Sequence, residues 1–427
     1  MSRSGLRHER VLDLIETSMG HGVEAGVIRL RVDDQASAGD TITLGGRPLV
    51  NFGSCAYLGL NVDPRLKQGA IDAIRRFGPV FSSSTAYTSI DLYTLLEDRL
   101  AQMFGTGHIV LPATTTLGHL AALPVLVSPD DVVLIDTQSH ASLRLATDVL
   151  RGRGVSVTDL PHNDMSALES AIQKAESNRV CRIWYMADGI YSMHGDVAPV
   201  HTIADLLDRH PALHVYLDDA HGFGWRGKHG RGYVLDKTPL HERMVIVVSL
   251  AKSFGTGGAA LLFADPATAR RVWLTGGTLT FSGPIHPAEL GAAVAAAEIH
   301  LSDEQAERQT KLIRQIDFVR DLLVEHQLPV VSLDPTPIWF IRVGRHDQAI
   351  NLAKRLMQDG FYTNTSAFPA VPRGKGGIRF TQTLYQTDDQ IRALINSMAR
   401  HVPEVVDEPG VIVDLTEETA QPAAKSA

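Results

Sequence analysis

The length, composition and charge of the chain are those of an ordinary globular protein. Its 427 residues are 44% hydrophobic and 21% charged, with a mean hydropathy of -0.01, which suits one large α/β unit and a smaller domain. The formal net charge of -8, without a sustained basic run, argues against a nucleic-acid partner. No apolar stretch reaches the roughly 20 residues that a membrane span needs.

The N-terminus and the cysteines indicate the compartment. The first residues lack the apolar core of a signal peptide. Two cysteines, Cys55 and Cys181, are too few for a disulfide framework, and no Cys/His spacing resembles a zinc site. We therefore expect a cytoplasmic protein with reduced thiols and no metal.

The chain up to residue 264 shows helical and strand periodicity in turn. Between residues 108 and 264 the two kinds of segment alternate regularly, which indicates a mainly parallel sheet covered on both faces. Helices are predicted over residues 7–18, 66–77, 89–104, 114–127, 142–151, 165–176 and 200–209, and strands over residues 27–32, 41–51, 108–111, 132–136, 155–160, 180–186, 213–217, 245–249 and 259–264.

The last third of the chain predicts a small α+β domain, because longer helices precede a mixture of strands and helices. Residues 403–427 are acidic and lack aromatic residues, which is typical of a loosely ordered tail. Helices are predicted over residues 266–275, 286–301, 304–326, 347–358 and 387–400, and strands over residues 329–343 and 377–383.

Reactive side chains follow two of the predicted strands. Asp218, Asp219 and His221 come directly after the strand 213–217, and Lys252 follows the strand 245–249. Open α/β sheets bind ligands at the carboxyl ends of their strands. Pyridoxal phosphate needs a lysine for its aldehyde and an acid for its ring nitrogen, so Lys252 and Asp218 predict a site for this cofactor.

Six motifs in chain order, which include the segments of Asp218 and Lys252, make the prediction specific. With them the sequence resembles the α-oxoamine synthases, a family of pyridoxal-phosphate enzymes that join an amino acid to an acyl thioester and release carbon dioxide. The matching segments are residues 51–52 with 57–60, 136–142, 188–199, 218–221 with 230–232, 249–252 and 368–372.

The resemblance implies a fold and a domain division. It implies an aminotransferase-like (fold type I) α/β fold, with a mainly parallel seven-stranded sheet in the large domain and a small C-terminal α+β domain. The expected parts are an N-terminal helix with short strands (1–50), the large cofactor-binding domain (51–285), linking helices with the small domain (286–402), and the acidic tail (403–427).

The resemblance also implies roles for individual residues. Lys252 would hold the cofactor aldehyde and later take the α-proton of the amino acid. Asp218 would pair with the ring nitrogen, His221 would hydrogen-bond the phenolic oxygen, His140 would stack on the ring, and Ser192 would contact the cofactor. Read without the resemblance, the two histidines would be ordinary turn histidines and Asp218 a turn cap.

Hydroxyl residues are the candidates for the cofactor phosphate. A helix N-terminus binds anions, and Thr114, Thr115 and Thr116 stand where the family has Ser-Gly-aromatic, although capping of the helix would explain them equally. Ser249 matches a family phosphate ligand. Ser282 lies in the segment that family members contribute to the site of a partner subunit, so a homodimer with shared sites is expected.

The substrate positions depart from the family pattern. Arg379 matches the arginine that grips the amino-acid carboxylate, whereas Cys55 replaces an asparagine that assists it. The segment 81–87, with Ser82 to Ser84, replaces a glycine-rich one, Tyr93 replaces a histidine, and Gly283-Pro284 replace hydroxyl residues. The amino acid, the acyl chain and the choice of coenzyme A or carrier protein as donor therefore stay open.

The expected activity is a decarboxylative condensation of an α-amino acid with an acyl thioester, which gives an α-amino ketone. Another pyridoxal-phosphate reaction on the same scaffold, of aminotransferase, lyase or aldolase type, is the alternative. A binding or carrier-docking protein that keeps the scaffold without catalysis is a second alternative.

Overall fold

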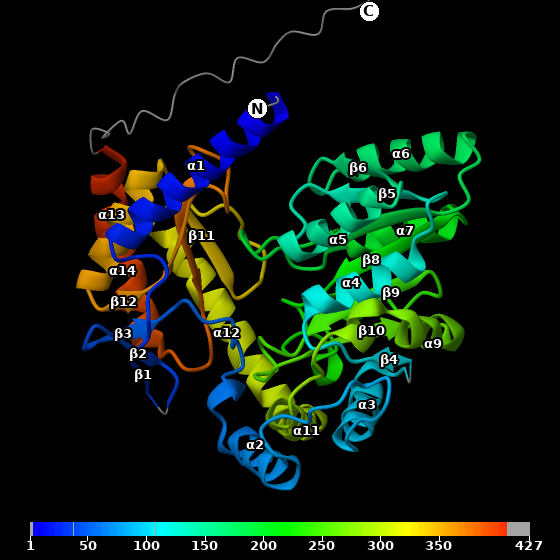
Figure 1. Cartoon of the computed structure of the whole chain (residues 1–427). Coiled ribbons are helices and arrows are strands. Elements are labelled where there is room, and N and C mark those ends of the chain that lie inside the picture. Colours follow the sequence, from blue (N-terminus) through cyan, green and yellow to red (C-terminus); the bar gives the residue numbers. More distant parts are fainter. Residues whose placement is uncertain (1–2, 37, 107, 408–427) are drawn as a thin grey trace, which may run out of the picture.

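A seven-stranded sheet forms the centre of the larger half of the molecule. The computed structural model describes residues 3–36, 38–106 and 108–407. Five neighbouring strands pair in parallel, and two further strands continue one edge through antiparallel pairings, of which only β10 runs in the opposite direction, as expected for a mainly parallel sheet (Figure 1). In spatial order they are β4 (Ile109–Val110), β10 (Ala259–Phe263), β9 (Met244–Ser249), β8 (Leu213–Asp218), β7 (Ile183–Asp188), β5 (Val132–Asp136) and β6 (Ser156–Leu160).

Helices bury both faces of this sheet, because successive residues of a strand point to opposite sides. Val133, Trp184 and Val247 face one cluster together with α4 (Thr115–Leu126), α5 (Ala141–Gly152) and α9 (Pro266–Thr275). The neighbouring strand residues face the main core on the other side. The helices there include α2 (Pro64–Phe77), α3 (Leu92–Phe104), α6 (Met165–Ser177), α7 (Val200–Arg209), α8 (Tyr233–Lys237) and α11 (Pro287–Leu301).

The smaller half combines segments from both ends of the chain. Strand β3 (Arg47–Asn51) pairs in parallel with β12 (Phe361–Tyr362), which joins the N-terminal strands to the C-terminal part. Helix α1 (Arg3–Glu24) lies along this half in Figure 1. Its other elements are β1 (Asp34–Gln35), β2 (Thr41–Leu44), α12 (Glu304–Glu325), β11 (Ile338–Gly344), α13 (His346–Gln358), β13 (Asn364–Ser366), β14 (Gly376–Thr381) and α14 (Asp388–Asp407).

Three sequence predictions differ from the structure. Residues 27–32 are not a strand, because the N–H groups of Val27 and Ile28 bond to Gly22 O and end α1 instead. Residues 329–337 contain three prolines, which lack a backbone donor, so only Ile338–Gly344 of the predicted strand region forms β11. Residues 403–407 belong to α14, where Val405 is fully buried; the rest of the predicted tail lies outside the described residues.

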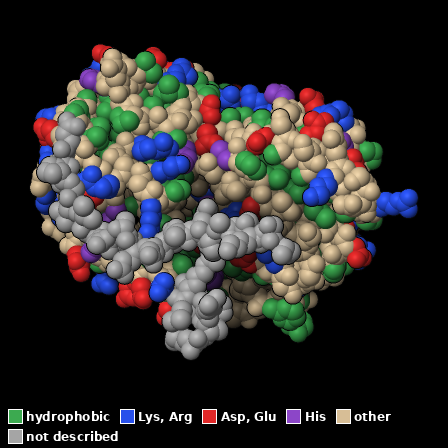
Figure 2. All heavy atoms as spheres, turned by 90° about the horizontal axis from the view of Figure 1, so that it is seen from above, with side chains coloured by type: hydrophobic (Ala, Val, Ile, Leu, Met, Phe, Trp, Pro, Cys, Tyr) green, Lys and Arg blue, Asp and Glu red, His purple; other side chains and the backbone are tan. Residues whose placement is uncertain are grey.

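The surface carries charges of both signs. On the face shown in Figure 2, basic and acidic side chains are interspersed over both halves. Within the described ranges, no helix is both long and apolar enough to cross a membrane.

Candidate active site

Acidic residues end three neighbouring strands of the central sheet. Asp188 of β7 and Asp218 of β8 are cross-strand partners, and Asp136 ends β5 on the other side of β7. The turn that carries Lys252 follows β9, which pairs with β8. The structure thus brings Lys252 and Asp218 to the same sheet edge, as the sequence predicts.

The electrostatic setting of Lys252 favours a reactive amine. The side chain is partly buried, and burial lowers the pKa of Lys252 more than the nearby charges of Asp218 and Cys55 raise it. A lysine with a lowered pKa has a larger share of the neutral, nucleophilic form at neutral pH.

Asp218 stays ionised although it is only 5% exposed. Its Oδ1 accepts a hydrogen bond from the Ala220 N–H at 3.0 Å, and its Oδ2 lies 3.2 Å from His119 Nε2. Burial raises the pKa of Asp218, but the hydrogen bond to His119 and the charge of Lys252 outweigh burial and bring the pKa to about 2. Burial and the charge of Asp218 raise the pKa of its neighbour Asp188 well above the usual value.

His140 lies at the rim of the same edge, at the N-terminus of α5. Its N–H donates to the two carboxylate oxygens of Asp188 at 3.1 and 3.2 Å, and its Nδ1 lies 2.7 Å from Ser142 Oγ. Partial burial of the ring lowers the pKa of His140. The charge of Asp218 opposes this decrease, and the charge of Lys252 reinforces it. A neutral ring with an exposed side chain suits the predicted stacking on a planar ligand.

His221 is hydrogen-bonded to Tyr57 through its ring. The hydroxyl of Tyr57 lies 2.7 Å from His221 Nδ1. Burial raises the pKa of Tyr57 and lowers that of His221 well below its usual value, so both side chains are neutral and the hydroxyl can donate to Nδ1. The ring proton of His221 is then on Nε2, the nitrogen that can donate to a phenolic oxygen.

Arg379 connects the small half of the molecule to this site. Its Nε donates to the backbone carbonyl of Ser192 at 2.6 Å, and its Nη2 lies 3.8 Å from Cys55 Sγ. Burial raises the pKa of Cys55, but the charges of Arg379 and Lys252 outweigh it and lower the pKa overall. Arg379, Cys55 and Ser192 therefore meet at the site, and Ser192 contributes its carbonyl oxygen to this contact.

The start of α4 lies beside the end of β9. Ser249 is the cross-strand partner of Ala259, whose N–H donates to Pro112 O at 3.0 Å. Thr114 accepts a hydrogen bond from the Leu117 N–H, so its side chain caps the helix. This is the alternative to phosphate binding that the sequence left open. Thr115 and Thr116 form the first turn, where helix N–H groups face outward.

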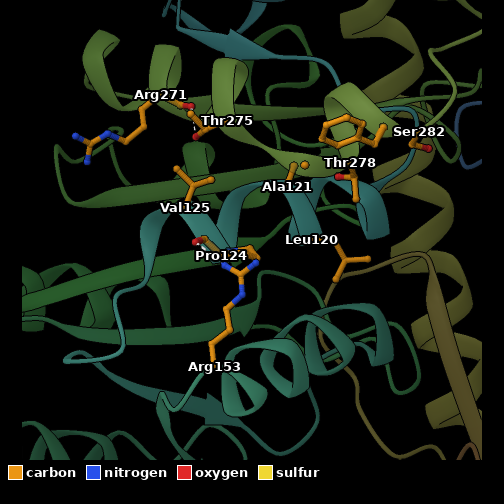
Figure 3. A pocket seen from close by; sticks show the side chains of 11 residues that line it. Leu120, Ala121, Pro124, Val125, Arg153, Arg271, Thr275, Thr278 and Ser282 are labelled. Carbon is orange, nitrogen blue, oxygen red and sulfur yellow. Dashed lines mark hydrogen bonds between the residues drawn. The ribbon is translucent and has the colours of Figure 1, made fainter. Parts of the chain in front are cut away.

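Ser282 lies at a different place. It lines a pocket of about 660 Å³ beside the outer face of α4, together with Thr278 and the 90% exposed Phe281 of α10 (Gly277–Phe281). Figure 3 shows Pro124 and Val125 of α4 in its wall, with Arg153 and Arg271 on opposite sides. Ser282 thus directly follows α10 at the edge of this pocket.

Three residues around the site carried no role in the sequence prediction: Tyr57, His119 and Asp188. Tyr57 and Asp188 lie inside segments that matched the family, but only their neighbours were assigned. His119 could have been noticed as the histidine that interrupts the apolar part of α4, four residues and about one turn after Thr115.

Comparisons with known proteins agree with this architecture. The family model described as aminotransferase class I and II matches residues 47–397. The 8-amino-7-oxononanoate synthase of Geobacter sulfurreducens is 31% identical over 88% of this chain and 95% of its own length. The serine palmitoyltransferase of Sphingobacterium spiritivorum is 27% identical over 86% of this chain and 90% of its own. Among solved structures, the serine palmitoyltransferase of Sphingomonas wittichii superposes with a TM-score of 0.84 at 21% identity, covering 93% of this chain and 98% of its own.

Proposed function

The chain belongs to the aminotransferase class I and II family and, within it, to the α-oxoamine synthases, and we propose how its own residues perform the reaction of that family. It is a pyridoxal-phosphate-dependent acyltransferase that condenses an α-amino acid with an acyl thioester, with loss of carbon dioxide. The roles of its residues are assigned mainly from one observation. Lys252, an amine of lowered pKa, and the ionised Asp218 lie at the same edge of the sheet.

The residues at this edge fit pyridoxal phosphate. Lys252 offers an amine for the aldehyde, Asp218 an acceptor for a protonated ring nitrogen, and His221 an Nε2–H for the phenolic oxygen. The first turn of α4 and Ser249 offer N–H and hydroxyl groups for the phosphate. When bound, the cofactor supplies a conjugated ring that accepts the electron pair left by bond cleavage at the α-carbon of the amino acid.

Lys252 has two tasks in this arrangement. Its amine would hold the aldehyde of the cofactor, and once the amine of the substrate takes that place its Nζ would be available as a base. The lowered pKa of Lys252 increases the unprotonated share of this amine, the form that can take the α-proton of the amino acid. The charge of Asp218 limits how far the pKa of Lys252 falls, so the amine keeps part of its basicity.

Arg379 would bind the carboxylate of the amino acid. Its guanidinium group is buried and held by Ser192 O, and a carboxylate in this place could form a charge-assisted pair with it. Cys55 stands beside it as a thiol of lowered pKa where relatives use an amide. An anionic thiolate would compete with the carboxylate for Arg379, so substrate binding favours the protonated thiol.

The reaction is tested by incubating the protein with amino acids and acyl thioesters, separately and together. Carbon dioxide and an α-amino ketone should form only when both substrates are present, and a mass-spectrometric screen of coenzyme A and carrier-protein thioesters would identify the pair. Lys252→Ala should lose the visible absorption of the bound cofactor and the product. Formation of an oxo acid from the amino acid alone would instead indicate aminotransfer.

A homodimer is supported by an apolar surface on the large half. Hydrogen bonds from Ser84 and Thr85 to the carbonyls of Thr280 and Leu279 join two segments into one face, which we call the α10 face. The exposed side chains on and beside it include Tyr87, Trp273, Leu274 and Phe281. Contact of this face with a second copy would cover them and would bring Ser282 to the boundary between subunits.

The cytoplasmic location stays part of the proposal. Cys55 and Cys181 are both free thiols, and free thiols persist in a reducing compartment.

A further inference from the structure

A buried chain of three polar side chains lies behind the predicted cofactor site. His119 of α4 is fully buried, with Nδ1 3.0 Å from the hydroxyl of Tyr216 and Nε2 3.2 Å from Asp218 Oδ2. Tyr216 is also fully buried, and it lies two residues before Asp218 on β8, with its side chain on the same face of the strand.

The direction of the hydrogen bonds follows from the chemistry of the two ends. Burial and the charge of Asp218 raise the pKa of Tyr216 well above its usual value, so the phenol keeps its proton. An ionised carboxylate can only accept. The Tyr216 O–H therefore donates to His119 Nδ1, and the proton on Nε2 is directed to Asp218.

We propose that His119, held by Tyr216, is a positioning residue that keeps Asp218 a fixed, weakly basic carboxylate and thereby keeps the proton on the cofactor ring nitrogen. The inference rests on the proposed function, because it concerns the partner of that nitrogen. A donated hydrogen bond stabilises the charged form of a buried carboxylate and makes it a weaker base.

The surroundings of Asp218 explain why this help is needed. Burial favours a protonated Asp218, and the Ala220 N–H supplies one hydrogen bond against it. Without His119, Asp218 would more readily hold the proton itself and donate it to an unprotonated ring nitrogen. The ring would then be a weaker electron acceptor.

Helix α4 would act at both ends of the cofactor. Thr115 begins the helix at the predicted phosphate position, and His119 follows four residues later on the buried side, against β8. The same rigid element would therefore set the position of the phosphate and the protonation of the ring nitrogen.

The test compares three variants of the holoenzyme by the nitrogen-15 chemical shift of the cofactor, labelled at its ring nitrogen. His119→Phe keeps a ring of similar size but removes the donor, so the signal should move from the protonated toward the unprotonated position. His119→Gln places an amide N–H near the original Nε2 and should retain most of the wild-type shift. Tyr216→Phe leaves His119 free to change tautomer and should give an intermediate shift.

Turnover provides a second measurement. His119→Phe should lower kcat about 10- to 100-fold, the size seen when partners of metal-binding histidines are removed, with a smaller change in KM for the amino acid. His119→Gln should recover most of the loss. Equal losses of kcat in both variants, with an unchanged nitrogen shift in each, would overturn the inference and assign His119 to packing.

The outcomes also separate this inference from the proposed function. If the wild-type protein binds no cofactor and shows no nitrogen signal, the proposed function fails independently of His119. If wild type shows a protonated nitrogen and the variants do the same, only the role of His119 is wrong. Should His119→Phe not fold, the contrast between wild type, His119→Gln and Tyr216→Phe still decides the question, since an unchanged shift in Tyr216→Phe contradicts the inference.

Discussion

The hydroxyl of Tyr57 and Nδ1 of His221 lie 2.7 Å apart, although the two residues come from distant parts of the chain. Tyr57 belongs to the segment between β3 and α2, and His221 follows β8 on the central sheet. With the Tyr57 hydroxyl as donor, the ring proton of His221 lies on Nε2, so a residue outside the sheet influences what a residue at the sheet edge can donate.

Tyr57→Phe should therefore impair the site without disturbing the fold. The loss of one hydrogen bond, worth about 0.5–1.5 kcal/mol, should reduce kcat/KM about 2- to 10-fold and change the visible absorption of the bound cofactor. Tyr233→Phe is a matched control, because its hydroxyl donates to Ala198 O away from the site. Identical spectra for wild type and Tyr57→Phe would contradict the assigned role.

Cys55 should react with iodoacetamide through its thiolate, since Arg379 and Lys252 lower its pKa. Alkylation, followed by mass spectrometry, should inactivate the enzyme and be slowed by the amino-acid substrate. Arg379→Gln should slow the labelling of Cys55 and leave that of the exposed Cys181 unchanged. Equal slowing at both cysteines would show that the effect is not electrostatic.

The elements of the fold were predictable where a local pattern of apolar residues marks them in the sequence. Strand β5 and helices α7 and α9 have the predicted bounds, because continuous apolar runs or an amphipathic period mark them in the sequence. Strand β12 has two residues and exists through pairing with β3, which lies about 310 positions earlier. No local pattern reports such a pairing.

The same distinction applies to the site. Lys252, Asp218 and His221 follow strands of one sheet, and the carboxyl ends of parallel strands meet at one edge, so the sequence could place them together. The partners that set their protonation, such as Tyr57 and His119, come from other elements and meet them through tertiary packing. The charge states of the site therefore required the structure.

The stability of the protein should decrease between about pH 6.5 and 9 because of His162. Its Nδ1 lies 3.0 Å from Asp136 and its Nε2 2.6 Å from Asp196, while the ring packs edge-on against Tyr191. These carboxylates outweigh burial and raise the pKa of His162 to about 9. A raised folded-state pKa stabilises the protein fully below the unfolded-state value of about 6.5, and this contribution is lost as the pH rises through 9.

The size of the effect has an upper bound of about 3 kcal/mol, from a pKa difference of about 2.5. Urea unfolding at pH 6 and pH 9.5 would measure it through the midpoint. His162→Gln, which cannot titrate, should be less stable at pH 6 and should lose this pH dependence. A wild-type midpoint that stays constant over the range would refute the assignment.

The α10 face should drive dimer formation through Phe281, whose side chain is 90% exposed in the single chain. Exposed aromatic residues at the centre of an interface contribute strongly to binding, so Phe281→Asp should shift sedimentation toward the monomer. Leu145→Asp is the matched control, because Leu145 is 51% exposed on α5. If Ser282 reaches the partner site, the Phe281→Asp monomer should also bind the cofactor phosphate more weakly, and cofactor dissociation should increase with dilution. A wild-type protein that is monomeric at every concentration, with full cofactor affinity, would show that the site is complete in one chain.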